Sequence, residues 1–82
     1  MSDKKFYVYS KGGCGFCDRL TQFMDNKGVS YQKFNLGEDY SKEDFIDKFG
    51  YNSSYPQVVF EHQKIGGMKD TVRYLVDKNM VH

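Results

Sequence analysis

The order of elements in the first 36 residues constrains the fold of this chain more than any other feature. Lys5-Phe6-Tyr7-Val8-Tyr9 is an aromatic and β-branched run, typical of a strand at the centre of a sheet and buried on both faces. Residues 10–13, which contain two glycines, break this run, and a helical pattern begins at Cys14 and ends near Gly28. Residues 29–36 again have strand character. This succession is a βαβ unit, so we expect two parallel strands joined by a right-handed crossover.

The apolar residues of the two longer helices indicate which side of each helix faces the core. In the first helix they recur at i, i+4, i+7 and i+8, namely Phe16, Leu20, Phe23 and Met24. In the last helix, predicted from residue 68 to 78, the same spacing holds for Met68, Val72, Leu75 and Val76. We therefore expect both stripes to pack on the sheet.

The second half of the sequence predicts a short helix followed by two strands. Ser41 and Asp44 resemble a capping box, and Gly50 closes the helix that they open. A polar loop leads to Pro56, residues 57–61 form a strand, and residues 62–64 turn into Ile65. Together these elements predict an α/β protein of the form βαβ then ββα, with a four-stranded mixed sheet and three helices. We expect a single domain over residues 1–82.

Composition excludes several classes of function. The 12 Lys and Arg against 11 Asp and Glu leave a net charge of +1, whereas electrostatic nucleic-acid binding requires a strongly basic patch. No apolar stretch is long enough to span a membrane, and the segment Met1-Ser2-Asp3-Lys4-Lys5 has no apolar signal region. We therefore expect no nucleic-acid or membrane partner and a reducing, cytoplasmic location.

The two cysteines, Cys14 and Cys17, are too few for a disulfide scaffold, but their spacing suits thiol–disulfide exchange. We expect Cys14 at the helix N-cap as the exposed, attacking sulfur and Cys17 in the first turn as the resolving one. The helix N–H groups and the nearby Lys11 favour the thiolate form of such a cysteine. Zinc prefers four ligands, and the histidines, His62 and His82, have no ligand spacing to the cysteines, so we predict no metal site.

Three segments in this order resemble the glutaredoxins of the thioredoxin superfamily. Residues 8–17, from Val8 through Lys11 to Cys17, are similar to the family's first strand, lysine and active-site loop. Tyr55-Pro56-Gln57-Val58-Val59-Phe60 is similar to its Thr-Val-Pro segment and the following strand, and Ile65-Gly66-Gly67 precedes the last helix as in the family. The resemblance covers the chain from Phe6 to about Lys78.

The resemblance implies a cis peptide bond before Pro56 and a thiol–disulfide oxidoreductase that uses glutathione as cosubstrate. The Tyr55 backbone is then expected to hold the cysteinyl part of glutathione, Lys11 its glycine carboxylate, and Gly67 with the start of the last helix its γ-glutamyl carboxylate. The complete set of expected glutathione contacts is Lys11, Gly15, Phe16, Tyr55, Pro56, Gly67, Met68, Lys69 and Asp70. Expected protein substrates carry disulfides or glutathionylated cysteines, ribonucleotide reductase being a common one in the family, and the chain is expected to be a monomer.

Two departures from the family pattern keep alternative functions open. Between the cysteines, Gly15-Phe16 replaces the usual Pro-Tyr and is typical of monothiol members that bind iron–sulfur clusters. One alternative is therefore a carrier in which Cys14 from each of two chains and two glutathiones hold a 2Fe–2S cluster. Lys69 stands where many members have Asp or Ser against the glutathione ammonium, so a second alternative is reduction by a thioredoxin-reductase-type enzyme. In addition, Tyr55 is bulkier than the valine usual at its position.

Overall fold

The chain folds, in a computed structural model that describes residues 5–80, into a four-stranded mixed sheet and three helices. Residues 1–4 of the N-terminal segment and His82, on which predictions were made above, lie outside the described residues. The elements in chain order are β1 (Phe6–Ser10), α1 (Gly15–Asn26), β2 (Tyr31–Asn35), α2 (Lys42–Phe49), β3 (Gln57–Phe60), β4 (Gln63–Gly66) and α3 (Met68–Asp77). Over residues 5–80, no helix is both long and apolar enough to cross a bilayer.

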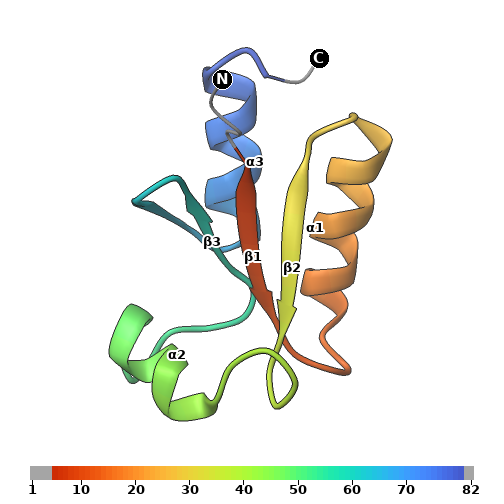
Figure 1. Cartoon of the computed structure of the whole chain (residues 1–82). Coiled ribbons are helices and arrows are strands. Elements are labelled where there is room, and N and C mark those ends of the chain that lie inside the picture. The colour runs from red at the N-terminus through yellow and green to blue at the C-terminus, as the bar shows by residue number, and fades with distance from the viewer. Residues whose placement is uncertain (1–4, 81–82) are drawn as a thin grey trace.

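The sheet has the order β2-β1-β3-β4, with β1 near its centre (Figure 1). β1 runs parallel to β2 and antiparallel to β3, and β3 runs antiparallel to β4. This confirms the predicted βαβ–ββα arrangement, including the parallel first pair. Because the loop between β1 and α1 is short, the start of α1 lies close to the end of the sheet at which β1 finishes.

The two faces of β1 pack against different layers, because successive side chains of a strand point to opposite sides. Val8 belongs to a cluster of buried side chains that includes Leu20 and Met24 of α1 and Leu75 of α3. On the other face, the Tyr9 ring lies 5.0 Å from that of Phe49 in α2. Figure 1 shows α2 near the end of the sheet at which β1 finishes, apart from α1 and α3. Because α2 is short, Tyr7 and Tyr9 are only half-buried, so the prediction of a β1 strand buried on both faces was wrong.

The helical stripes are narrower than predicted. Val76 is 55% exposed and Phe16 is 58% exposed, whereas Thr71, which no apolar pattern selects, is fully buried. The reason is geometric: the sheet is small, so each helix buries only the residues directly facing it, and the edges of the stripe remain in solvent. Met68 and Val72 are half-buried, as such edge positions should be.

The boundaries of two elements also differ from the prediction. Gln63 and Lys64 lie in β4 rather than in a turn. The chain instead reverses at Glu61 and His62, and Glu61 has a positive φ of 58°. β4 is at the edge of the sheet, so its polar side chains stay exposed and give no apolar signal. The predicted capping box of α2 is present, with Ser41 and Asp44 each accepting from the other's backbone N–H.

Candidate active site

Cys14 is the N-cap of α1, because the glycine-rich loop ends the strand and leaves Cys14 in an extended conformation, with φ of −96°. Its Sγ accepts a hydrogen bond from the Cys17 backbone N–H at 3.2 Å, and its carbonyl accepts from the Asp18 N–H at 3.2 Å. Both cysteines are free thiols. The sulfur of Cys14 is thus held against the unpaired N–H groups of the first helical turn, where negative charge is stabilised.

The two thiols differ in burial. Cys17 has no exposed surface and Cys14 is 8% exposed, so the prediction of an exposed Cys14 sulfur was wrong in degree, although Cys14 is the more accessible of the two. The pKa of Cys17 is raised to about 12, mainly by burial and then by its interaction with the Cys14 side chain, while the Lys11 backbone acts in the opposite direction. Near neutral pH the inner thiol therefore keeps its proton.

A groove of about 340 Å³ lies beside the cysteine loop and brings together distant parts of the chain. Its lining joins Phe16, which lies between the two cysteines, to the residues around Pro56 and to the first turn of α3. The peptide bond between Tyr55 and Pro56 is cis, as the resemblance implied. The lining residues are Phe16, Ser54, Tyr55, Pro56, Gln57, Gly66, Gly67, Met68, Lys69 and Asp70.

Seven of the nine predicted glutathione contacts line this groove, and the other two, Lys11 and Gly15, do not. Gly15 is exposed at the start of α1, directly after Cys14. The Lys11 ammonium lies 5.2 Å from the centroid of the Tyr55 ring, so it stands at the wall of the groove that Tyr55 forms. Sequence reasoning did not select Ser54, Gln57 and Gly66; their only signal is adjacency to residues that it did select. What each residue binds stays a prediction.

The N-terminus of α3 forms part of the groove lining. Gly67 is its N-cap and provides no side-chain hydrogen bond, so the first N–H groups of α3 are open to a ligand. The Asp70 carboxylate lies against the Cα of Gly66: a Cβ at Gly66 would come within 2.5 Å of Asp70 Oδ2. Gly66 also has a φ of 123°, a conformation that side chains rarely adopt. Glycine at this position therefore leaves room for the Asp70 side chain in the groove.

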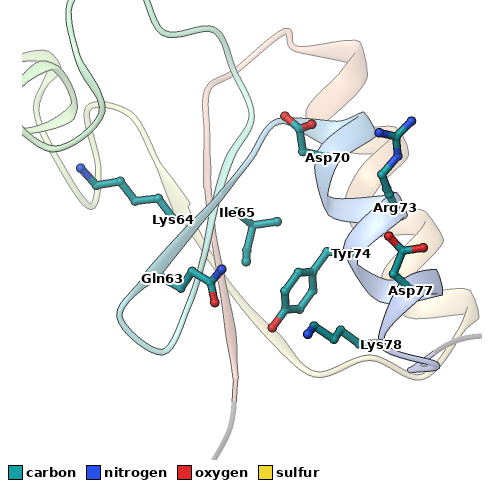
Figure 2. Close-up of a pocket in the computed structure, with 8 residues that line it drawn as sticks. All are labelled: Gln63, Lys64, Ile65, Asp70, Arg73, Tyr74, Asp77 and Lys78. Atoms are coloured by element: carbon teal, nitrogen blue, oxygen red, sulfur yellow. The ribbon is translucent and has the colours of Figure 1, made fainter.

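A second cavity of about 350 Å³ lies between β4 and α3. Figure 2 shows Ile65 and Tyr74 between these two elements, with Asp70, Arg73 and Asp77 along the helix. Asp70 lines both cavities, but neither cysteine lines this one. For exchange chemistry the groove beside Phe16 is therefore the relevant site.

Comparison with known proteins finds glutaredoxins by family model, by sequence and by structure. A model of the glutaredoxin family matches residues 7–65. Glutaredoxin 3 of Escherichia coli K12 is 30% identical over 63 residues, which cover 77% of this chain and 76% of that protein. The crystal structure of a buckwheat glutaredoxin–glutathione complex is 26% identical with a TM-score of 0.72, covering 92% of this chain and 71% of that one. Glutaredoxin 1 from Francisella tularensis, solved with cacodylate, is 20% identical with a TM-score of 0.74, covering 93% and 95%, and supports the fold alone.

Fold, site and relatives together define a thiol–disulfide oxidoreductase of the thioredoxin fold. The family match spans most of the described chain and includes the cysteine loop, the cis-proline and most of β4. The chain belongs to the glutaredoxin family.

Proposed function

We propose that the chain is a glutathione-dependent reductase of protein disulfides and of glutathione mixed disulfides, acting through Cys14 and Cys17. The observation that carries this proposal is the asymmetry of the pair: Cys14 Sγ accepts from the Cys17 N–H, while Cys17 is fully buried and its pKa is about 12. Cys14 is therefore the attacking sulfur, and Cys17 holds its proton until it is needed.

The reaction is a sequence of thiol–disulfide exchanges. The Cys14 thiolate attacks one sulfur of the substrate disulfide; a Cys14–substrate disulfide forms, and the other sulfur leaves as a thiolate that takes up a proton. With a protein disulfide as substrate, Cys17, deprotonated as the substrate thiolate leaves, then attacks Cys14 Sγ, which forms the Cys14–Cys17 disulfide and releases the reduced substrate. With a glutathione mixed disulfide as substrate, the adduct is a Cys14–glutathione disulfide; a second glutathione thiolate attacks its glutathione sulfur, which forms glutathione disulfide and releases the Cys14 thiolate. When Cys17 resolves the adduct, two glutathiones reduce the Cys14–Cys17 disulfide and become glutathione disulfide.

The groove offers complementary groups to each part of glutathione. The backbone of Tyr55, exposed by the cis bond, pairs with the cysteinyl unit, and Lys11 attracts the glycine carboxylate. The open N-terminus of α3 at Gly67 receives the γ-glutamyl carboxylate of glutathione. The negative charge of Asp70 offsets the positive charge of Lys69 near the glutathione ammonium. Gly15, Phe16, Pro56 and Met68 complete the contact surface next to Cys14. The buckwheat relative, solved as a glutaredoxin–glutathione complex, supports this assignment.

The decisive experiment is turnover of a small glutathione mixed disulfide, coupled to glutathione and glutathione reductase. We expect Cys14→Ser to abolish turnover and Cys17→Ser, the matched control, to retain it, because a second glutathione can resolve the adduct. An active Cys14→Ser with an inactive Cys17→Ser would reverse the assigned roles. If only a thioredoxin-reductase-type enzyme sustains turnover, the reductant is that enzyme, and Lys69 is the residue that accounts for weak glutathione binding.

A cluster-binding function is the second candidate, and Gly15-Phe16 is the feature that favours it. Within residues 5–80 no group of three or more His, Cys, Asp or Glu could hold a metal ion, so a 2Fe–2S cluster would need Cys14 from two chains together with two glutathiones. Anaerobic reconstitution with iron, sulfide and glutathione distinguishes the cases: a coloured dimer supports this candidate, and a colourless monomer removes it.

A further inference from the structure

The Tyr55 side chain makes contacts that are separate from the proposed pairing of the Tyr55 backbone with glutathione. Its ring stacks on that of Phe45 in α2, with centroids 4.2 Å apart and planes 17° from parallel. The same ring lies 5.2 Å from the Lys11 ammonium. An aromatic ring attracts a cation placed over its face, so Tyr55 is both fixed by α2 and able to hold the lysine.

Tyr40 fixes the same region from behind. Its hydroxyl donates to the Ser10 carbonyl at 2.6 Å, and its ring lies 6.0 Å from that of Phe45. Burial raises the pKa of Tyr40, and its interaction with the Tyr55 side chain raises it further. Ser10 is fully buried and directly precedes Lys11. The backbone before Lys11 and the ring beside its ammonium are thus tied to one cluster.

A lysine held in this way binds a carboxylate with a smaller loss of freedom. A free lysine side chain has many rotamers, and binding a ligand normally removes them at an entropic cost. Contact with the Tyr55 ring restricts the side chain before the ligand arrives, so less freedom is lost on binding. Valine, which is usual at this position in the family, has no aromatic face and cannot do this.

We propose that Tyr55 is a positioning residue that holds the Lys11 ammonium at the wall of the active-site groove for the carboxylate of the thiol cosubstrate. The proposal rests on the proposed function only for the identity of that carboxylate, the glycine carboxylate of glutathione. Tyr55 acts here through Lys11 and takes no part in the exchange of sulfurs, so its effect falls on binding.

The kinetic test compares Tyr55→Val with Tyr55→Phe, which keeps the ring, and with Tyr51→Val, which removes a tyrosine that is 82% exposed. We expect Tyr55→Val to raise the KM for glutathione about three- to tenfold while kcat changes much less, the size of effect that a partly exposed cation–π contact gives. Tyr55→Phe should restore a KM within about twofold of the original, and Tyr51→Val should leave it unchanged.

A double-mutant cycle tests whether the effect passes through Lys11. In a Lys11→Ala background, Tyr55→Val should raise KM by less than about twofold, because the cation that the ring holds is gone. The proposal is overturned if Tyr55→Val raises KM equally in both backgrounds, if it leaves KM unchanged, or if Tyr55→Phe fails to rescue. Circular dichroism of each variant establishes that it is folded.

A direct structural readout is independent of glutathione. In an NMR spectrum of the reduced protein, the ring of residue 55 should shift the Lys11 methylene signals nearest the ammonium upfield. We expect this shift in the unsubstituted protein and in Tyr55→Phe. The shift should vanish in Tyr55→Val; its absence from the original protein contradicts the proposal. If the original protein shows no glutathione-dependent turnover, the proposed function fails, whereas this spectrum still decides whether Tyr55 holds Lys11.

Discussion

Two cysteines separated by two residues have very different environments in this protein. Cys14 caps α1 and accepts a backbone hydrogen bond, and Cys17 lies inside the first turn with no exposed surface. The difference follows from helix geometry, because the residue three positions after the cap is turned toward the sheet while the cap itself lies at the helix end. One sulfur is thereby suited to attack and the other to storing a proton.

The buried Cys17 thiol should make stability fall in alkaline solution. Its pKa is raised from 9.0 to about 12 on folding, first by burial, so the folded chain keeps a proton that the unfolded chain loses. The stabilising contribution is complete below pH 9.0 and is lost as the pH rises toward about 12. In this window the free energy of unfolding of the reduced protein should therefore fall as the pH rises. We expect the fall to be steeper than that of Cys17→Ala by about 1 kcal/mol per pH unit.

Urea unfolding at several pH values between 8 and 11, under reducing conditions, measures these two slopes. The raised pKa values of Tyr9 and Tyr31 do not involve Cys17, so these tyrosines contribute equally to both proteins and cancel in the comparison. Cys17 is a minor cause of the raised pKa of Tyr40, so the part of the Tyr40 contribution that depends on Cys17 is counted with the Cys17 effect. Equal slopes for the two proteins would show that Cys17 titrates normally in the folded state.

At the scale of elements, α2 supports the active site although it supplies no residue to the groove. It is short, from Lys42 to Phe49, and its capping box fixes where it begins. Its Phe45 is buried and stacks on Tyr55, and its Phe49 packs on Tyr9 of β1. Isolated helices of this length are marginal in water, so the cap and the aromatic contacts together hold α2 in place.

Removing the cap of α2 should therefore destabilise the fold. Ser41 Oγ accepts from the Asp44 N–H at 3.1 Å, and the Asp44 carboxylate accepts from the Ser41 N–H at 3.2 Å. We expect Ser41→Ala to lower the free energy of unfolding by about 1 kcal/mol, measured by urea denaturation. Ser30→Ala, at an exposed position in the loop before β2, is the matched control and should change it by less than about 0.5 kcal/mol. Similar losses in the two variants would mean that the capping box contributes nothing specific.

At the scale of the whole molecule, an 82-residue chain has one small apolar layer between the sheet and the pair α1 and α3. Leu20, Met24 and Leu75 are fully buried there. The opposite face of the sheet is covered by aromatic rings that α2 only partly shields. Since total stability for a chain of this length is about 4–12 kcal/mol, each residue of the apolar layer accounts for a large share.

Two neighbouring residues of α3 should illustrate this. Leu75 is fully buried and Val76 is 55% exposed. We expect Leu75→Ala to lower the free energy of unfolding by about 2–5 kcal/mol through lost burial and a residual cavity, and Val76→Ala to change it by less than about 0.5 kcal/mol. Chemical denaturation of both variants provides the measurement. If Val76→Ala costs as much as Leu75→Ala, α3 buries a wider stripe than the structure gives it.

Local patterns predicted most of the elements because their causes are local. A glycine pair ends β1, Gly28 follows the end of α1, and Ser41 with Asp44 begins α2; each acts within a few residues. Patterns failed where burial depended on what lies opposite. Phe16 and Val76 have the spacing of core residues but lie beyond the edge of the sheet, and Thr71 is buried because α3 turns it inward.

The sequence by itself determined the class of chemistry and the order of elements. Cys14 and Cys17 at a helix start, a proline before a strand and a glycine pair before a helix are each readable in isolation, because short-range sterics and hydrogen bonding set them. Only the tertiary structure decided that Tyr55 meets both Lys11 and Phe45, and that Cys17 has no access to solvent. These properties depend on how separate segments pack across the sheet, and a single strand or helix contains no information about its distant neighbours.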